Sequence, residues 1–319
     1  MNNLWKIHSL HDGKVSDKWE SYLYVYEELF FKFRQSSINL LEIGVQNGGS
    51  LEVWSRYFPV AKKIIGCDIN LACKSLIFDD ERVSVIVADA NSDIAFNQIR
   101  QISSDFDIVI DDGSHTSGDI INSFLRYFPV INSGGIYIAE DLHCSYWSEF
   151  DGGIFDPLSA VSFFKALADS LNREHFGVPD ALERIFDGFK EKYKLSIDYN
   201  LFNEIKSIEF FNSVCIVKKI EKAGAPAGLG CRVVSGSMAT VATESMKHRG
   251  GYLSAPNQEG NLWSNLRENP SINHYKNLEN IALLNDHISH LEGELLLIKN
   301  SFLWKLNKNL KKIGRIVFK

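Results

Sequence analysis

The sequence predicts an α/β protein with a Rossmann-like, doubly wound and mostly parallel sheet, an antiparallel edge strand and a C-terminal helical tail. Short apolar runs recur through the first 220 residues, and such nearly continuous runs are typical of strands buried on both faces of a parallel sheet. Segments with helical spacing separate the runs, which implies right-handed crossovers between the strands. Two further β-rich runs meet at Asn212-Ser213 and indicate a hairpin at one edge of the sheet.

Each predicted element corresponds to a definite stretch of the chain. The parallel strands are predicted over INLLEIGV (38–45), KIIGCDI (63–69), VSVIVADA (83–90), DIVIDD (107–112) and GIYIAED (135–141). Helices are predicted over SLEVWSRYF (50–58) and DIINSFLRYFPVI (119–131), and the hairpin over KSIEFFNSVCIVKKI (206–220).

The chain divides into three parts by composition. Residues 1–220 form the α/β domain, in which residues 145–200 are an aromatic-rich insertion that we expect to be helical after Pro157. Because this insertion follows the fifth strand, we expect it to lie over the carboxyl ends of the strands, as a lid or substrate segment. Residues 221–272 are rich in small and polar residues, which indicates a linker or a loosely packed segment.

Residues 273–319 carry a heptad pattern, which predicts a helix that associates with other helices. Apolar residues alternate at spacings of four and three, and this predicts a homo-oligomer. The seam comprises Leu284, Ile288, Leu291, Leu295, Ile298 and Phe302, continued by Leu306, Leu310, Ile313 and Val317. From Lys299 onward the tail is basic and has no acidic residue. Its end is either an amphipathic helix resting on an anionic membrane surface or a packing helix whose lysines face water.

Composition excludes several classes of protein. The 319 residues are 45% hydrophobic and 23% charged, as in folded globular proteins, and the net charge of −6 argues against nucleic-acid binding. The five cysteines show no CxxC spacing, which argues against a disulfide framework or a zinc site and favours a reducing compartment. The N-terminus lacks the apolar core of a signal peptide, and no run of about 18 apolar residues occurs. We therefore expect a cytoplasmic location, extended to the inner face of the membrane if the basic tail rests there.

A glycine-containing turn and a set of acids predict a cofactor site at the carboxyl ends of the strands. Gly44 and Gly48 permit a tight turn between the first strand and the first helix, although Gln46 breaks a GxGxxG pattern. Asp68 follows Gly44 by 24 residues, which suits a ribose diol. Seven carboxylates end strands at this rim: Glu42, Asp68, Asp89, Asp111, Asp112, Glu140 and Asp141. They would repel a pyrophosphate but suit a cofactor with sulfonium and ammonium groups, together with a divalent cation.

Three of these acids and a histidine predict a metal-assisted proton transfer. Asp112 and the pair Glu140-Asp141 end neighbouring strands and offer an all-oxygen site, which suits magnesium, manganese or calcium better than zinc. His115 follows Asp112 by three residues on the same turn. It is therefore a candidate base for a hydroxyl whose acidity the ion has raised.

At these residues the chain resembles the macrocin and mycinamicin sugar O-methyltransferases, which use S-adenosylmethionine. The resemblance covers about residues 10–150 and rests on these segments: SDKWESYLYVYEELF, LLEIGVQNGGSLEVWSRYFP, IIGCDIN, VADANSD and DIVIDDGSHTSGDIINSFLRYFPVINSGGIYIAEDLHCSYW. The DDGSH and ED motifs keep the order and spacing of that family. The insertion after Trp147 and everything beyond residue 220 find no match, so substrate identity does not carry over.

The resemblance implies a Rossmann-like, magnesium-dependent methyltransferase. It implies magnesium ligands at Asp112, Glu140 and Asp141, with His115 as the base. It implies cofactor contacts from Glu42, Gly44, Asp68 and Asp89, with Asp111 nearby. The segment SFLWKLNKNLKKI (301–313) resembles the S-x-x-W-[KR]-L endings of bacterial surface-polysaccharide enzymes.

These observations favour methyl transfer from S-adenosylmethionine to a sugar or glycan hydroxyl, in surface polysaccharide or glycosylated natural product biosynthesis. Two alternatives remain. An NAD-dependent sugar oxidoreductase would also use a doubly wound sheet, but the acidic rim and the missing GxGxxG argue against it. A non-catalytic scaffold of a glycan-assembly complex would explain the long tail, but it would not need the acid and histidine set.

Overall fold

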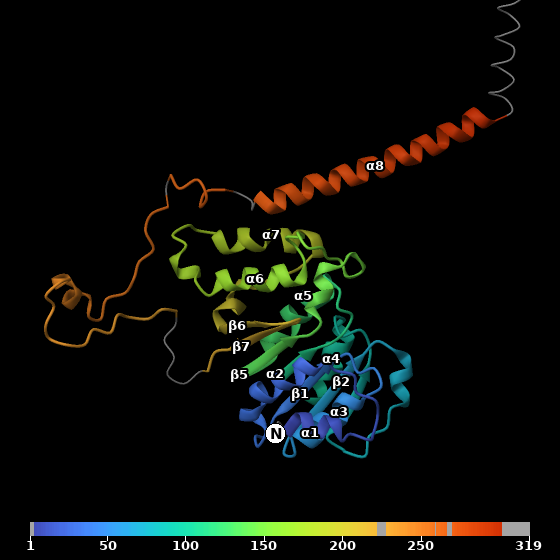
Figure 1. Cartoon of the computed structure of the whole chain (residues 1–319), viewed down its shortest axis with the longest axis horizontal. Helices are drawn as coiled ribbons and strands as arrows, with labels where there is room; N and C mark the ends of the chain where they lie inside the picture. Colours follow the sequence, from blue (N-terminus) through green and yellow to red (C-terminus); the bar gives the residue numbers. More distant parts are fainter. Residues whose placement is uncertain (1–2, 222–227, 259, 267–269, 302–319) are drawn as a thin grey trace, which may run out of the picture. The chain divides into compact units, whose positions relative to one another are not determined.

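In the part of the chain that the computed structural model describes, residues 3–221, 228–258, 260–266 and 270–301, seven strands form one sheet (Figure 1). Their order across the sheet is β3-β2-β1-β4-β5-β7-β6. The first five strands are parallel, and all lie close to the predicted runs. Their bounds are β1 (Asn39–Ile43), β2 (Lys63–Asp68), β3 (Val83–Val87), β4 (Phe106–Asp111) and β5 (Ile131–Ala139).

The predicted hairpin is present and completes one edge of the sheet. Strands β6 (Ile205–Phe211) and β7 (Val214–Lys219) meet at Asn212-Ser213, where Ser213 has a φ of 67°. Strand β7 pairs antiparallel with both β5 and β6. The antiparallel strand is therefore the inner member of the hairpin, and the outermost strand, β6, runs in the direction of the first five.

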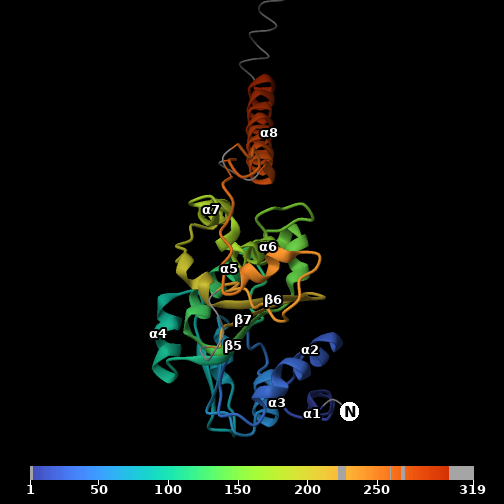
Figure 2. The same cartoon turned by 90° about the vertical axis from the view of Figure 1, so that its left-hand side faces the viewer.

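Helices cover both faces of the sheet (Figure 2). Helices α1 (Asn3–Ser9), α2 (Glu20–Phe30) and α3 (Gly49–Tyr57) share one aromatic core with the strands. In this core Phe30 stacks on Tyr26 and meets Trp54 edge to face, with 5.5 Å between the ring centres of Phe30 and Trp54. Helices α4 (Asp93–Ile102) and α5 (Ser117–Tyr127) lie on the opposite face. The burial of these rings fixes α2 and α3 against the strands that carry the site.

The insertion after β5 is helical, as predicted, and its helices add to the layer of helices on one face of the sheet. Helix α6 (Ala160–Ser170) packs against α5, β6 and helix α7 (Ala181–Tyr193). Phe163 lies 5.9 Å from Phe124 of α5 and 5.3 Å from Phe189 of α7, measured between ring centres. The insertion also reaches the carboxyl ends of the strands, where the ring centres of Phe150 and His115 are 6.3 Å apart and the Ala160 N–H donates to the Ser117 hydroxyl at the start of α5.

Beyond the sheet the chain has little regular structure until one long helix. Within 228–258 and 260–266 the one helical segment is a 3₁₀ helix, Thr243–His248. The chain divides at residue 267, and the second unit contains α8 (Pro270–Asn300), which includes the predicted heptad seam as far as Ile298. Phe302, the remaining seam residues and most of the basic tail lie outside the described residues. Among those described, no helix has the length and apolar character needed to cross a bilayer.

Candidate active site

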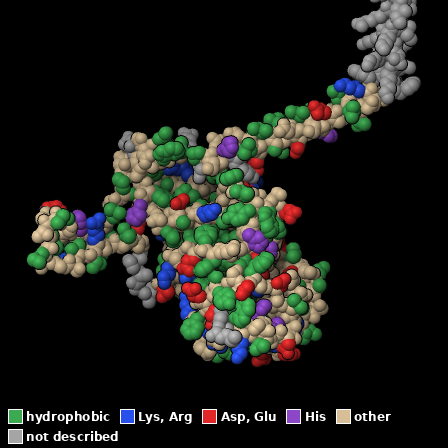
Figure 3. All heavy atoms as spheres, in the orientation of Figure 1, with side chains coloured by type: hydrophobic (Ala, Val, Ile, Leu, Met, Phe, Trp, Pro, Cys, Tyr) green, Lys and Arg blue, Asp and Glu red, His purple; other side chains and the backbone are tan. Residues whose placement is uncertain are grey.

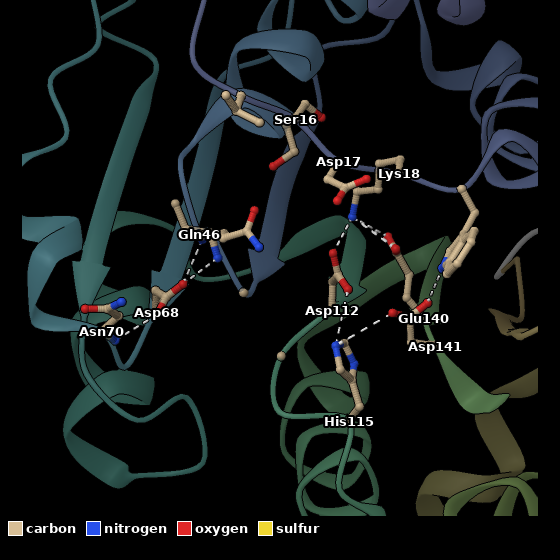
Figure 4. Close-up of a pocket in the computed structure, with 16 residues that line it drawn as sticks. Ser16, Asp17, Lys18, Gln46, Asp68, Asn70, Asp112, His115, Glu140 and Asp141 are labelled. Carbon is tan, nitrogen blue, oxygen red and sulfur yellow. Dashed lines mark hydrogen bonds and ion pairs between the residues drawn. The ribbon is translucent and has the colours of Figure 1, made fainter. Parts of the chain in front are cut away.

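The carboxyl ends of β1, β2, β4 and β5 bring the predicted acids to one rim, around a cavity of about 470 Å³ that we call the main cleft. The register places Ile43 beside Asp111 and Asp111 beside Ala139, so the acids that follow these strands are neighbours. Residues 15–19, which precede α2, form the opposite wall (Figure 4). The main cleft is lined by Val15, Ser16, Asp17, Lys18, Trp19, Gly44, Val45, Gln46, Ser50, Asp68, Asn70, Asp112, Gly113, His115, Glu140 and Asp141.

The turn after β1 needs glycine at its first position. Gly44 has a φ of 88°, and a Cβ atom on it would lie 1.9 Å from the carbonyl oxygen of Asp112. The Asp68 carboxylate accepts hydrogen bonds from the N–H groups of Val45 (2.8 Å) and Gln46 (2.9 Å), which fixes the turn. Gly48 also has a positive φ, 83°, but it faces Leu76 and Phe78 and does not line the main cleft. It therefore shapes the start of α3.

Asp89 and Asp111 lie beside a second, smaller space of about 180 Å³, which we call the side cavity. Gly44, Asp68 and Gly113 line both spaces, so the two adjoin at the glycine turn. Asp111 is 4% exposed and accepts a hydrogen bond of 2.7 Å from the Tyr137 hydroxyl. Burial raises the pKa of Asp111 to about 6, partly opposed by its hydrogen bonds.

A buried carboxylate cluster closes one end of the main cleft, and Lys18 lies in its centre (Figure 4). The Lys18 Nζ is 2.5 Å from Asp112 Oδ2, 2.9 Å from Glu140 Oε1 and 3.5 Å from Glu42 Oε1. Glu42 also accepts hydrogen bonds from Ser50 (2.7 Å) and Trp54 (3.2 Å). Glu42, predicted as a cofactor contact, thus belongs to this cluster. One of its carboxyl oxygens lies within 4.8 Å of an oxygen of Asp112 and an oxygen of Glu140.

Burial and mutual attraction oppose each other in this cluster. Burial alone would lower the pKa of Lys18, but Glu140, Asp112 and Glu42 outweigh it and raise that pKa well above its ordinary value. Burial raises the pKa of Glu140, with the charge of Asp112 adding to the rise and Lys18 opposing it. Burial likewise raises the pKa of Glu42 against the attraction of Lys18. The cluster thus places one ammonium group among three carboxyl groups, and the remaining carboxyl oxygens are potential ligands for a cation.

His115 and Asp141 form the outer part of the site. His115 Nε2 lies 3.9 Å from Asp112 Oδ1 and 3.8 Å from Asp141 Oδ2. Asp141, with a φ of 52°, accepts hydrogen bonds through its other oxygen from Trp19 Nε1 (3.1 Å) and the Tyr22 hydroxyl (2.7 Å). Asp112 is shared, because one oxygen faces Lys18 and the other faces His115. Asp112, His115 and Asp141 therefore make a second set whose ligand atoms lie within 4.8 Å of one another.

The predicted metal ligands thus divide between two sets of side chains. Asp112 contributes to both, Glu140 faces Lys18 and the Tyr26 hydroxyl, and Asp141 faces His115. Glu140 and Asp141 therefore both lie next to Asp112. Their oxygens are a hard donor set that fits a divalent cation such as Mg²⁺.

The hydrogen-bond donors of this site come from residues 18–26, a segment for which the sequence predicted no role. Lys18, Tyr22 and Tyr26 recur every four residues and place an ammonium and two hydroxyl groups against Asp112, Glu140 and Asp141. The helical spacing of Tyr22 and Tyr26 is the available signal, because groups four residues apart share one side of a helix; Lys18 precedes α2 and has no such signal. The segment before it is tightly seated: a Cβ atom on Gly49 would lie 2.2 Å from the Lys14 carbonyl oxygen.

Curated relatives resemble about half of this chain. The 8-demethyl-8-alpha-L-rhamnosyl tetracenomycin-C 2'-O-methyltransferase of Streptomyces olivaceus is 36% identical over 171 residues, 50% of this chain and 44% of the relative. The mycinamicin VI 2''-O-methyltransferase of Micromonospora griseorubida is 35% identical over 47% of this chain and 39% of its own length. The demethylmacrocin O-methyltransferase of Streptomyces fradiae is 32% identical over 53% of this chain and 45% of its own length.

The chain is similar to the macrocin- and mycinamicin-type sugar O-methyltransferases. It spans less than half the length of the three curated relatives. No family model matches it. Among solved structures, the MycE methyltransferase in complex with Mg, SAH and mycinamycin VI is 27% identical, with a TM-score of 0.55 over 70% of this chain and 55% of that chain. This similarity confirms the predicted Rossmann-like fold.

Replacing Lys18 tests the charge balance of the cluster. We expect Lys18→Met to lower the free energy of unfolding near pH 9 by about 3–5 kcal/mol, because the buried carboxylates of Glu42 and Glu140 would lose their cationic partner. The loss should shrink as pH falls, since protonation of these two carboxyls, whose pKa values burial raises, removes the unpaired charge. Urea unfolding followed by circular dichroism measures both effects.

The matched control is Lys14→Met, in the same segment. Lys14 pairs with Glu52 at 2.6 Å, but both side chains are partly exposed, so we expect a change of at most about 1 kcal/mol. An equal, small change in both variants would contradict the role given to Lys18.

Proposed function

We propose that this chain transfers a methyl group from S-adenosylmethionine to a sugar hydroxyl, in a reaction that needs a divalent cation, Mg²⁺ above all. The observation that carries the proposal is the meeting of a glycine turn, an acidic rim and a histidine in one cleft. The similarity to MycE, a structure described with Mg and SAH, supports the same assignment.

For the methyl donor, we propose that it occupies the main cleft and the side cavity on either side of the glycine turn. Gly44 lets the turn pass close to the backbone of Asp112, and Asp68 holds the turn in place. Asp89 and Asp111 lie along the side cavity. The negative charge of this rim suits the sulfonium and ammonium groups of S-adenosylmethionine and disfavours the pyrophosphate of a dinucleotide.

For the cation, Asp112, Glu140 and Asp141 are the proposed ligands. Asp112 Oδ1 and Asp141 Oδ2 hold no hydrogen bond to the described residues, so these oxygens are available, and both lie next to His115. Magnesium bound there would supply Lewis-acid stabilisation to two neighbouring hydroxyls of the acceptor sugar. Lys18 holds Asp112 and Glu140 in position through hydrogen bonds to Asp112 Oδ2 and Glu140 Oε1.

For the base, we propose His115. Its Nε2 takes the proton of the acceptor hydroxyl, and the carboxylates of Asp112 and Asp141 within 4 Å stabilise the imidazolium that forms. The deprotonated oxygen then bonds to the methyl carbon of the donor as the carbon–sulfur bond breaks, which releases S-adenosylhomocysteine. Phe150 limits the movement of the imidazole on one side.

The proposed acceptor is a sugar of a glycosylated natural product or of a bacterial surface polysaccharide. One relative is named for methylation of a rhamnosyl group on tetracenomycin C, and another for methylation of mycinamicin VI. The polysaccharide assignment rests on the sequence of the tail, most of which lies outside the described residues. We place the chain in the cytoplasm, with its basic end at the inner face of the membrane.

We further propose that α8 joins two or more copies of the chain. Its seam residues Leu284, Ile288, Leu291, Leu295 and Ile298 are 46–61% exposed within one chain, and Figure 3 shows hydrophobic side chains along the visible face of this helix. A second copy presents an identical stripe with the same period, so the two stripes match.

His115→Asn is expected to lower the rate of methyl transfer about 10²–10⁴-fold, because it removes the base but keeps a polar group of similar size. Affinity for S-adenosylhomocysteine, measured by calorimetry, should stay unchanged. His175→Asn is the control, since His175 lines neither cavity and should leave the rate unaltered. Full activity of His115→Asn would refute the assignment of the base.

Removal of divalent cations with EDTA is expected to abolish methyl transfer, and added Mg²⁺ should restore it. Asp141→Asn should weaken Mg²⁺ binding, measured by calorimetry, because one anionic ligand is lost. Glu149→Gln, at an exposed acid nearby in sequence, serves as the control. Turnover that persists in EDTA would overturn the requirement for a cation.

The assembly through α8 is tested with the double variant Ile288→Asp/Leu295→Asp in the full chain. Burying charges in the seam is unfavourable, so light scattering coupled to gel filtration should show a monomer. The control is Leu283→Asp/Leu297→Asp, which changes exposed leucines off the seam. Equal masses for all three proteins would rule out the seam as the interface.

A further inference from the structure

A third hollow, larger than the main cleft and lined by aromatic rings, opens beside the site. We call this space of about 730 Å³ the aromatic cleft. It is lined by Trp19, Glu20, Ser21, Tyr22, Tyr24, His143, Trp147, Asn212 and Ser213. Trp19 and Trp147 are 59% and 50% exposed, so large ring surfaces are left without cover. Exposed apolar surface that is gathered in one hollow and rimmed by polar groups is typical of a ligand-binding groove.

Hydrogen bonds hold the walls of the aromatic cleft in place. The His143 Nδ1 lies 2.5 Å from the Ser213 hydroxyl, and the Leu142 N–H donates to the Ser213 carbonyl oxygen at 2.9 Å. These bonds tie the segment after β5 to the β6–β7 hairpin. The His143 ring meets Trp147 at 5.0 Å and Trp19 at 6.1 Å between ring centres, edge to face in both cases. The cleft is therefore formed before any ligand arrives.

The aromatic cleft adjoins the proposed reaction centre at Trp19. Trp19 lines both the aromatic cleft and the main cleft, and its indole N–H donates to Asp141, a proposed metal ligand. This bond occupies the polar edge of the ring and leaves its face for a ligand. A molecule whose reacting hydroxyl lies at His115 would therefore extend over Trp19 toward Trp147.

The chemistry of the lining favours a neutral sugar ring. Sugar rings present a C–H face, which packs on an aromatic ring, and hydroxyl groups around the edge, which need hydrogen-bond partners. The cleft offers both, since Ser21, His143, Asn212 and Ser213 accompany the rings. Among the described residues lining it there is no lysine or arginine, and Glu20 is acidic. Phosphate groups of a nucleotide sugar would find no cationic partner here.

We propose that the aromatic cleft binds the neutral sugar next to the one that is methylated, with Trp147 as the main contact. This inference rests on the proposed function, because it assigns the part of the acceptor that lies outside the reaction centre. It makes the preferred acceptor a glycan of at least two sugar units.

The test uses the full chain with Mg²⁺ and S-adenosylhomocysteine, titrated with a rhamnose trisaccharide while tryptophan fluorescence is recorded. Rhamnose is chosen because one relative is named for a rhamnosyl substrate. We expect saturable binding that is about tenfold weaker in Trp147→Ala, which corresponds to ~1.4 kcal/mol. Trp147→Phe should recover part of the affinity, and Tyr146→Ala, at a neighbouring exposed ring outside the cleft, should match the wild type.

Three further ligands, compared with the trisaccharide, separate the outcomes. Methyl α-L-rhamnopyranoside should bind weakly and equally to wild type and Trp147→Ala, since it fills only the reaction centre. The proposal is overturned if the trisaccharide does not bind, if Trp147→Ala leaves its affinity unchanged, or if a nucleotide-linked rhamnose binds better than the trisaccharide in a Trp147-dependent way. A dependence on Trp147 confined to para-nitrophenyl α-L-rhamnopyranoside would assign the cleft to an aglycone and likewise overturn it.

Calorimetry with S-adenosylhomocysteine alone keeps this test separate from that of the proposed function. Trp147 lines neither the main cleft nor the side cavity, so its replacement should not change donor affinity. Loss of donor binding in the wild type would defeat the proposed methyl transfer, while a Trp147-dependent affinity for the trisaccharide would still stand.

Discussion

The compensation of three carboxylates by one buried ammonium is the interaction on which the rest of the site depends. Glu42, Asp112 and Glu140 come from three different strands, and a parallel sheet brings their ends together whether or not their charges repel. Glu42 and Glu140 are almost fully buried, so water cannot screen them. Lys18 and the hydroxyl group of Tyr26 supply the missing donors. The N-terminal segment is thus part of the site and not a covering of the domain.

The fold could be predicted from sequence because its signals are local. Continuous apolar runs mark buried parallel strands, and the acids that end them must share one rim in this topology. The position of α6 and α7 could not be predicted in the same way. Their apolar faces show that they pack, but the choice of α5 and β6 as neighbours depends on rings such as Phe124 and Phe163, which are far apart in the chain.

The candidate site was predictable in its acids and its histidine but not in its contacts. Glu140 and Asp141 are adjacent in sequence yet face different partners, because the left-handed backbone at Asp141 turns its side chain toward His115. Lys18 lies 122 residues from Glu140, and a lysine before a tryptophan is usually exposed to solvent. Tertiary packing alone determines that it is buried, so no local pattern identifies its partners.

Trp19 belongs to the walls of two spaces, and this has an energetic consequence. Residues 15–19 border the main cleft, and the last of them also borders the aromatic cleft. A ligand bound in either space meets the same indole ring, so occupation of one space affects the energy of binding in the other. The coupling is reciprocal: a ligand in the main cleft changes the affinity of the aromatic cleft by the same factor as a ligand in the aromatic cleft changes that of the main cleft. The proposed donor and acceptor would then bind as a coupled pair without any rearrangement of the sheet.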